Sequence, residues 1–118
     1  MANFRELKVW HKARELANAV YDFTADFPKN ELYGLLSQLR RAAVSVMSNI
    51  AEGSLGRTST DFARFVSLAR SSTAEVESLL VLAQDRRYGE ESLRRRCETL
   101  ESEIARMLTA LQNRLNRQ

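Results

Sequence analysis

Apolar residues recur every three or four positions along almost the whole chain, in blocks separated by short polar or glycine-containing breaks. This spacing matches the roughly 3.6 residues of an α-helical turn, so we expect a chain built of helices. The first helix is predicted to begin near Asn3, with Asn3 as its cap and Glu6 reaching back, and to end before Phe27-Pro28. Its apolar positions form two adjacent stripes, a face wider than one bundle core needs: Trp10, Ala13, Ala17, Val20, Tyr21 and Thr24, and beside them Val9, Leu16 and Phe23.

A second helix is predicted from about Leu32 to Glu52, where Gly53 and Gly56 stop it and a loop of residues 54–59 follows. Glycine favours helix ends because it has no Cβ to oppose a left-handed backbone. The positions expected to be buried in this helix are Leu32, Leu35, Leu36, Leu39, Ala42, Ala43, Val46 and Ile50.

The third helix is predicted to begin with Thr58 or Ser59 as its cap and to end at the Tyr88-Gly89 break. Glu90 opens a fourth helix, whose apolar positions alternate by four and three residues as in a coiled coil. The resulting narrow seam consists of Leu93, Cys97, Leu100, Ile104, Met107 and Leu111, and it continues to about Leu115.

Short connections between helices of about 20 residues force neighbours in the chain to run antiparallel. The predicted fold class is therefore all-α, an antiparallel up-down-up-down left-handed four-helix bundle that occupies residues 1–118 as a single domain. The composition agrees, because only 4 glycines and 1 proline interrupt a chain rich in strong helix formers. At 118 residues such a domain buries a core without covalent staples.

Residues suited to catalysis or metal binding are scarce. The one histidine, His11, is expected on a helix flank, and the one cysteine, Cys97, at a core position where it acts as a small hydrophobe. The chain lacks the Glu-x-x-His pairs of bundle metal sites, and Gly53 and Gly56 lack the lysine and hydroxyl of a phosphate-binding loop. We therefore expect no enzyme, no cofactor and no metal.

One cysteine cannot form an internal disulfide, and no apolar run approaches the ~18 residues of a membrane span. No charged-then-apolar leader opens the sequence. These features predict a cytoplasmic protein with no membrane partner.

The charge is mildly basic, +3 overall, and 15 of the 18 basic residues are arginine, whose planar donor fork suits phosphate. Asp85, Glu90 and Glu91 lie in the same turn as the densest arginine cluster and can neutralise it, so a solvated, salt-bridged surface is the open alternative. The cluster surrounds the turn between the third and fourth helices and is the candidate nucleic-acid contact: Arg86, Arg87, Arg94, Arg95 and Arg96.

Small polar side chains share one face of the second helix and one face of the third, each with one arginine and one glutamate. A solvated face usually carries longer side chains, so these stripes indicate packed polar contacts, either between subunits or between the second and third helices of one chain. As oligomer-interface candidates they are Arg41, Ser45, Ser48 and Glu52 on the second helix, and Arg64, Ser67, Ser71 and Glu75 on the third.

The most specific pattern is the run from Arg40 to Gly53, Arg-Arg-Ala-Ala-Val-Ser-Val-Met-Ser-Asn-Ile-Ala-Glu-Gly, followed by Phe62 to Ser72. Together with Phe4 to Trp10 and the Phe27-Pro28 turn, it resembles the signature of a family of small bacterial four-helix-bundle proteins. That family was first recognised as reading frames inside intervening sequences of 23S ribosomal RNA genes. The resemblance covers residues 4 to about 88.

The resemblance implies barrel-shaped homopentamers around a central channel, without established catalytic activity. Relatives commonly have proline where this chain has Met47, so we expect the same helix path here with a restored backbone bond. Five copies at +3 each would carry +15, which favours attraction to RNA or DNA.

These expectations combine into a homopentameric, non-catalytic scaffold associated with nucleic acid. RNA is preferred because of the ribosomal-RNA-gene context and a distant likeness to the bundle-shaped accessory proteins of diversity-generating retroelements. The alternative is a protein-interaction adaptor whose ring recruits a partner enzyme, and the salt dependence of binding distinguishes the two. An enzyme with an unrecognised site in the central channel is a third hypothesis.

Overall fold

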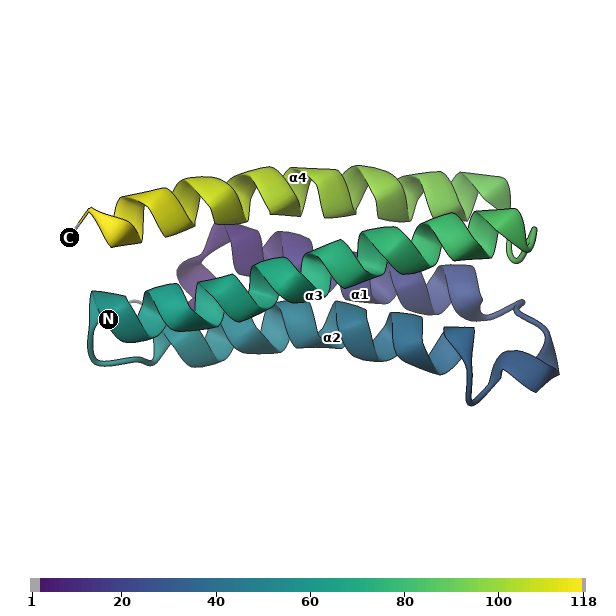
Figure 1. The fold of residues 1–118 in the computed structure, drawn as a ribbon, viewed down its shortest axis with the longest axis horizontal. Coiled ribbons are helices and arrows are strands. Elements are labelled where there is room, and N and C mark those ends of the chain that lie inside the picture. The colour runs from purple at the N-terminus through teal and green to yellow at the C-terminus, as the bar shows by residue number, and fades with distance from the viewer. Residues whose placement is uncertain (1–2, 118) are drawn as a thin grey trace.

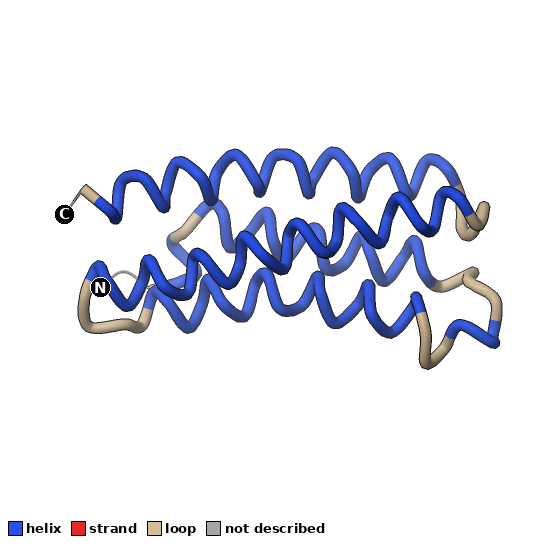
Figure 2. The backbone as a smooth tube through the Cα atoms, viewed as in Figure 1, coloured by secondary structure: helices blue, strands red, loops and turns tan. Residues whose placement is uncertain are grey.

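The computed structural model describes residues 3–117, which form helices and no strand (Figures 1 and 2). The long helices are α1 (Lys8–Thr24), α2 (Leu35–Ser54), α3 (Ser59–Asp85) and α4 (Glu91–Asn116). Short 3-10 turns precede the first two of these, η1 (Phe4–Glu6) and η2 (Lys29–Glu31). The predicted all-α fold with four helices is confirmed.

The helices lie along the long axis of a molecule that measures 45 × 22 × 20 Å. Helices adjacent in the chain pack side by side in alternating directions, and α4 closes the ring against α1 (Figure 1). Within the described residues the diagonal pairs, α1 with α3 and α2 with α4, share no close backbone contact. The left-handed sense of the bundle stays a prediction.

One core fills the space between the helices, and every helix contributes to it. On α4 the core seam differs from the expected one, because Leu108 is fully buried and Met107 only partly so. The four-residue step from Ile104 to Leu108 keeps the seam near the period of a straight helix, whereas Met107 belongs to the shorter coiled-coil period. The largest fully buried side chains include Leu16, Phe23, Leu39, Ile50, Leu80, Ile104 and Leu108.

The wide apolar face of the first helix is used within the chain. Both predicted stripes on α1 are buried except for Tyr21, because α1 packs against α2 on one side and α4 on the other. Phe4 covers the outer edge of this face, with its ring centroid 4.7 Å from that of Trp10. The width of this face therefore does not indicate a second subunit.

The start of the first helix was predicted too early. Asn3 accepts a hydrogen bond from the Arg5 N–H at 2.9 Å, but it caps only the short turn η1. Leu7 is extended, so the chain bends there and α1 begins at Lys8. This bend is what allows Phe4 to fold back over Trp10.

The second helix also begins later than predicted. Leu32 lies outside the helix and is 50% exposed, because η2 and Gly34 interrupt the chain before α2. The Glu31 carboxylate accepts the Leu35 N–H at 3.0 Å and so satisfies one of the free donors at the start of α2. A carboxylate side chain thus fixes a boundary that periodicity alone placed at Leu32.

Gly53 does not stop the second helix, which continues to Ser54. A Cβ at position 53 would lie 2.8 Å from the Cβ of Phe65 and 2.9 Å from the Phe62 ring, so the glycine permits close packing of α2 on α3. The helix also runs unbroken through Met47, as expected for a methionine in place of proline.

Candidate functional site

The arginine-rich turn lies at the end of the bundle where α3 stops and α4 begins, beside the loop that joins α1 to α2 (Figure 1). Two contacts fix the loop to the turn. The Tyr88 hydroxyl donates to Glu31 Oε2 at 2.9 Å, and the Tyr88 ring packs against Phe27. The backbone reverses through left-handed conformations at Arg87 (φ 59°) and Gly89 (φ 72°). We call this region, with its five predicted arginines, the arginine end.

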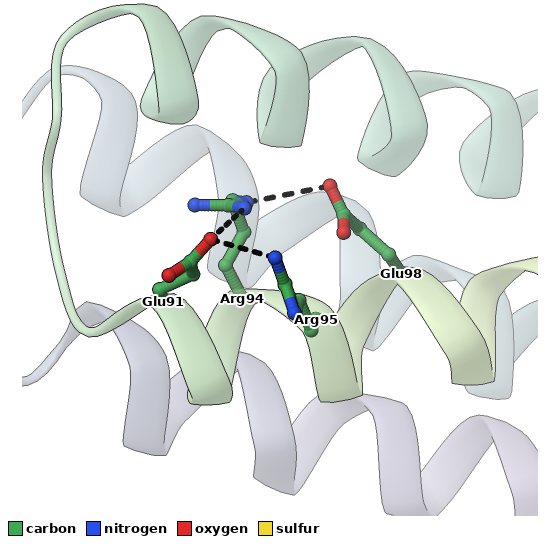
Figure 3. Close-up of polar contacts among 4 residues, drawn as sticks. All are labelled: Glu91, Arg94, Arg95 and Glu98. Atoms are coloured by element: carbon green, nitrogen blue, oxygen red, sulfur yellow. Dashed lines mark hydrogen bonds and ion pairs between the residues drawn. The ribbon is translucent and has the colours of Figure 1, made fainter.

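Arg94 does not point into solvent as a nucleic-acid contact would require. Its side chain is only 11% exposed and lies between Glu91 and Glu98, with ion pairs of 3.7 Å and 3.4 Å (Figure 3). Arg95 shares Glu91 at 2.9 Å but stays 70% exposed. Arg94 therefore holds the first turns of α4 together, and Glu98 is the partner that the sequence analysis did not identify.

The other three arginines of this end are exposed. Arg86, Arg87 and Arg96 form no ion pair within residues 3–117, although the Arg86 guanidinium lies 5.8 Å from the centre of the Tyr88 ring. Of the acidic residues expected to neutralise the cluster, only Glu91 pairs with an arginine among the described residues. Tyr88 and, to a smaller extent, Glu31 raise the pKa of the Arg86 guanidinium and partly compensate its charge, whereas Arg87 and Arg96 keep exposed charges without an ion-pair partner among residues 3–117.

An exposed aromatic residue lies at the same end and was missed. Tyr33 is 93% exposed in the loop between η2 and α2. Tyr88 also lies at this end, but its hydroxyl and ring are occupied by Glu31 and Phe27. No local pattern distinguishes Tyr33 from an ordinary loop residue, because only the fold brings its loop to the end of the bundle that holds the arginine-rich turn.

The predicted polar stripes lie on the outer surface of α2 and α3. Ser45 is the exception, because its hydroxyl pairs with Ser72 across the two helices at 2.9 Å and also receives Asn49 Nδ2 at 3.0 Å. The bond between the helices thus involves Ser72 and not Ser71. The remaining stripe residues are exposed: Arg41, Ser48, Glu52, Arg64, Ser67, Ser71 and Glu75.

The arginines and glutamates of the two stripes do not pair. Within the described residues no ion pair joins Arg41 or Arg64 to Glu52 or Glu75, and the Arg64 guanidinium instead lies over the Phe65 ring at 4.5 Å. Exposed apolar residues accompany the stripes on the same two helices: Val44, Leu68 and Leu82. Leu68 and Leu82 are spaced at multiples of seven around Glu75 and so share one line of α3.

We call this surface of stripes and apolar residues the outer α2–α3 face. It combines charged, hydroxyl and apolar side chains, and among residues 3–117 its arginines and glutamates form no ion pair with one another. Such a mixed surface is suited to contact with another protein or another copy of the chain.

His11 and Cys97 have ordinary structural roles. His11 Nε2 lies 2.6 Å from the Arg5 carbonyl oxygen, which ties α1 to η1. Burial raises the pKa of the Cys97 thiol to about 12, so the thiolate is not formed near neutral pH.

Between residues 3 and 117 no cluster of three or more His, Cys, Asp or Glu side chains is arranged to hold a metal ion. None of the helices there is long and apolar enough to cross a membrane.

Comparison with known proteins supports the resemblance seen in the sequence. No curated protein matches the chain significantly. A crystal structure of a protein of unknown function from the S23 ribosomal protein family of Bacteroides thetaiotaomicron has the same fold, with a TM-score of 0.78 and 21% identity over 88% of this chain and 97% of that chain. The family model described as 23S rRNA-intervening sequence protein matches residues 5–110. The chain therefore belongs to the family of 23S rRNA-intervening sequence proteins.

Proposed function

We propose that this protein is a non-catalytic, homo-oligomeric scaffold that associates with nucleic acid, preferentially RNA, through its arginine end. The observation that carries the proposal is the set of exposed guanidinium groups without ion-pair partners, those of Arg86, Arg87 and Arg96. Guanidinium groups bind phosphate through paired hydrogen bonds, and each contact releases a counterion from the nucleic acid.

The exposed ring of Tyr33 favours a single-stranded or looped target. Proteins that bind single strands combine basic side chains with aromatic rings on which bases stack. Tyr33 lies in the loop beside the arginine-rich turn and presents nearly its whole side chain to solvent. The preference for RNA rests on the family, whose name refers to 23S ribosomal RNA.

The outer α2–α3 face supports the oligomer. Its charged side chains lack internal partners, and Leu68 and Leu82 are exposed beside them. A neighbouring copy would bury these apolar side chains and supply partners for Arg41, Glu52, Arg64 and Glu75. The resemblance to pentameric relatives makes five the expected number of copies, which concentrates +15 of formal charge in one particle at +3 per chain.

Fluorescence anisotropy with a labelled single-stranded RNA tests the proposed interface. The variant Arg86→Gln/Arg87→Gln/Arg96→Gln removes three charges from the arginine end. A matched control, Arg57→Gln/Arg114→Gln/Arg117→Gln, removes three exposed arginines from the opposite end of the bundle. We expect the first variant alone to weaken binding and to reduce the slope of log K against log salt concentration by about 2.

Equal weakening by both variants would contradict a localised interface, and an unchanged affinity in the first variant would exclude the arginine end.

Native mass spectrometry of Leu68→Glu tests whether the outer α2–α3 face is the contact between copies. We expect this variant to lose oligomer mass, whereas Tyr33→Ala should retain it.

A protein adaptor is the second candidate function, and exposed Leu68 and Leu82 are the observation that favours it. An apolar docking surface responds weakly to salt, whereas phosphate binding weakens steeply. Retained binding of a partner protein at high salt, with no affinity for RNA, would favour the adaptor.

A further inference from the structure

A groove between α3 and α4 is separate from the arginine end, and it shares Ser67 and Ser71 with the outer α2–α3 face. It encloses about 430 Å³, enough for a small ligand. Residues from both helices line it, including Arg70, Thr73 and Glu77 on α3 and Glu101 and Thr109 on α4. A second hollow of about 270 Å³ shares Glu77 and Glu101 with the first and adds Glu98.

Glu101 is the unusual residue of this groove. It is only 6% exposed, yet within the described residues its carboxylate has no hydrogen-bond donor and no ion-pair partner. A buried carboxylate is normally paired, because the loss of hydration otherwise costs several kcal/mol. The Glu101 oxygens are not sealed from solvent but reach the open groove, where a ligand could contact them.

The neighbouring polar residues along the α3–α4 contact are paired, except for Gln112 Oε1, which is buried without a hydrogen-bond partner in the described chain. Glu98 pairs with Arg94, and Gln112 Nε2 donates to the Ala63 carbonyl oxygen at 2.9 Å. Thr73 donates its hydroxyl proton to the Ala69 carbonyl oxygen at 2.8 Å, which leaves its oxygen free to accept. Arg70 borders the groove but forms no ion pair with Glu101.

The electrostatic surroundings of Glu101 favour the binding of a cation. Burial is the main cause that raises the pKa of its carboxyl group to about 7, and the negative charge of Glu77 raises it further. On its own helix Glu98 also raises this pKa, whereas Arg106 lowers it. At neutral pH the group is thus about half ionised, and a positive ligand would favour the ionised form.

We propose that the α3–α4 groove binds an alkylammonium cation, with a primary ammonium group on the Glu101 carboxylate and a second positive charge attracted toward Glu77 and Glu98. An ammonium group has three donors and no acceptor, and the groove offers the carboxylate oxygens and the Thr73 hydroxyl oxygen as acceptors. The spacing of carboxylates over two adjoining hollows suits a flexible chain with more than one amine, such as a polyamine. This inference does not depend on RNA binding.

Isothermal titration of the intact, nucleic-acid-free protein with spermidine tests the proposal. We expect binding that strengthens about tenfold between pH 6 and pH 8, because Glu101 ionises in this range while the amines of the ligand stay protonated. The charged groups facing Glu101 are Glu77 and Arg70 from α3 and Glu98 and Arg106 from its own helix.

Glu101→Gln should weaken binding about tenfold or more and abolish its pH dependence. Glu6→Gln, an exposed glutamate at the start of the chain, is the matched control and should bind like the wild type. Arg70→Gln should strengthen binding several-fold, because it removes a like charge from the edge of the groove.

A parallel titration with a capped lysine derivative, N-acetyl-lysine methylamide, distinguishes the sources of the ammonium group. Tighter binding of spermidine supports a free polyamine, whereas equal or tighter binding of the lysine derivative supports a lysine side chain of a partner protein. No binding of either ligand, or binding unchanged in Glu101→Gln, would overturn the proposal.

Discussion

The arginine end and the α3–α4 groove both hold charged side chains without partners in the described part of the chain, but they hold them in opposite environments. Arg86, Arg87 and Arg96 are exposed, so water solvates their charge and their lack of partners costs little stability. Glu101 is buried, so its charge is penalised in every folded molecule. Substitution of Glu101 should therefore change the free energy of unfolding, and substitution of the exposed arginines should not. Affinity for a polyanion should depend on the arginines and not on Glu101.

The largest expected effect concerns the pH dependence of stability. The pKa of Glu101 is raised from 4.5 to about 7 in the folded chain, so the folded state binds more protons than the unfolded state between these values. The free energy of unfolding should therefore fall by roughly 2–3 kcal/mol as the pH rises from 4.5 to 8. Urea unfolding of Glu101→Gln should lack this fall.

Glu31 provides an internal control for that measurement. Its pKa is lowered by the Leu35 N–H and then by the Tyr88 hydroxyl, so it loses its stabilising contacts only in acid, below its ordinary 4.5. Glu31 therefore changes stability below pH 4.5, whereas Glu101 changes it between pH 4.5 and about 7, so the two pH ranges do not overlap. A fall in stability above pH 5 that persists in Glu101→Gln would mean that another group causes it.

Tyr33→Ala tests the arginine end, where we expect a loss of RNA affinity without a loss of stability. The ring is almost fully exposed, so its loss should leave the free energy of unfolding within about 0.5 kcal/mol of wild type. Loss of a stacking platform should reduce RNA affinity by about 1–2 kcal/mol, measured by anisotropy. Tyr88→Phe is the matched control: it removes the hydrogen bond to Glu31, lowers the free energy of unfolding and leaves RNA affinity unchanged.

Helical periodicity was sufficient to predict the architecture. The apolar positions of α2 identified buried residues such as Leu35, Leu39 and Val46, and Thr58 caps α3 as expected, accepting the Asp61 N–H. These predictions succeeded because burial on a long amphipathic helix depends on spacing within that helix. The boundaries failed where individual contacts decided them: near Leu32 a local hydrogen bond from the Leu35 N–H to Glu31, and at Gly53 the close packing of α3.

The two regions differ in how far the sequence could reveal them. Consecutive arginines at a turn can be recognised in the sequence. The burial of Arg94 beside Glu98 cannot, because it depends on which side of α4 packs against α3. Glu101 follows a core leucine and looks like an ordinary surface residue of an amphipathic helix. A weak signal existed, since Arg94, Glu98 and Glu101 repeat at helical spacing beside the apolar seam, but it identified neither the groove nor the missing partner.

Arg94 lies between the two regions, and its removal tests whether the exposure of an arginine decides how much stability is lost with its charge. Its side chain is mostly buried and pairs with Glu98, which lies next to Glu101 in the groove. Arg94→Gln should leave Glu98 without its cation and lower the free energy of unfolding by about 1–2 kcal/mol, as measured by urea unfolding. Arg95→Gln, on the same helix turn and paired with Glu91 in solvent, should change it by less than about 0.5 kcal/mol. Both substitutions remove one positive charge, and the two arginines differ in exposure. Equal losses of stability would mean that burial does not determine what an ion pair contributes here, and would contradict the contrast between the arginine end and the groove.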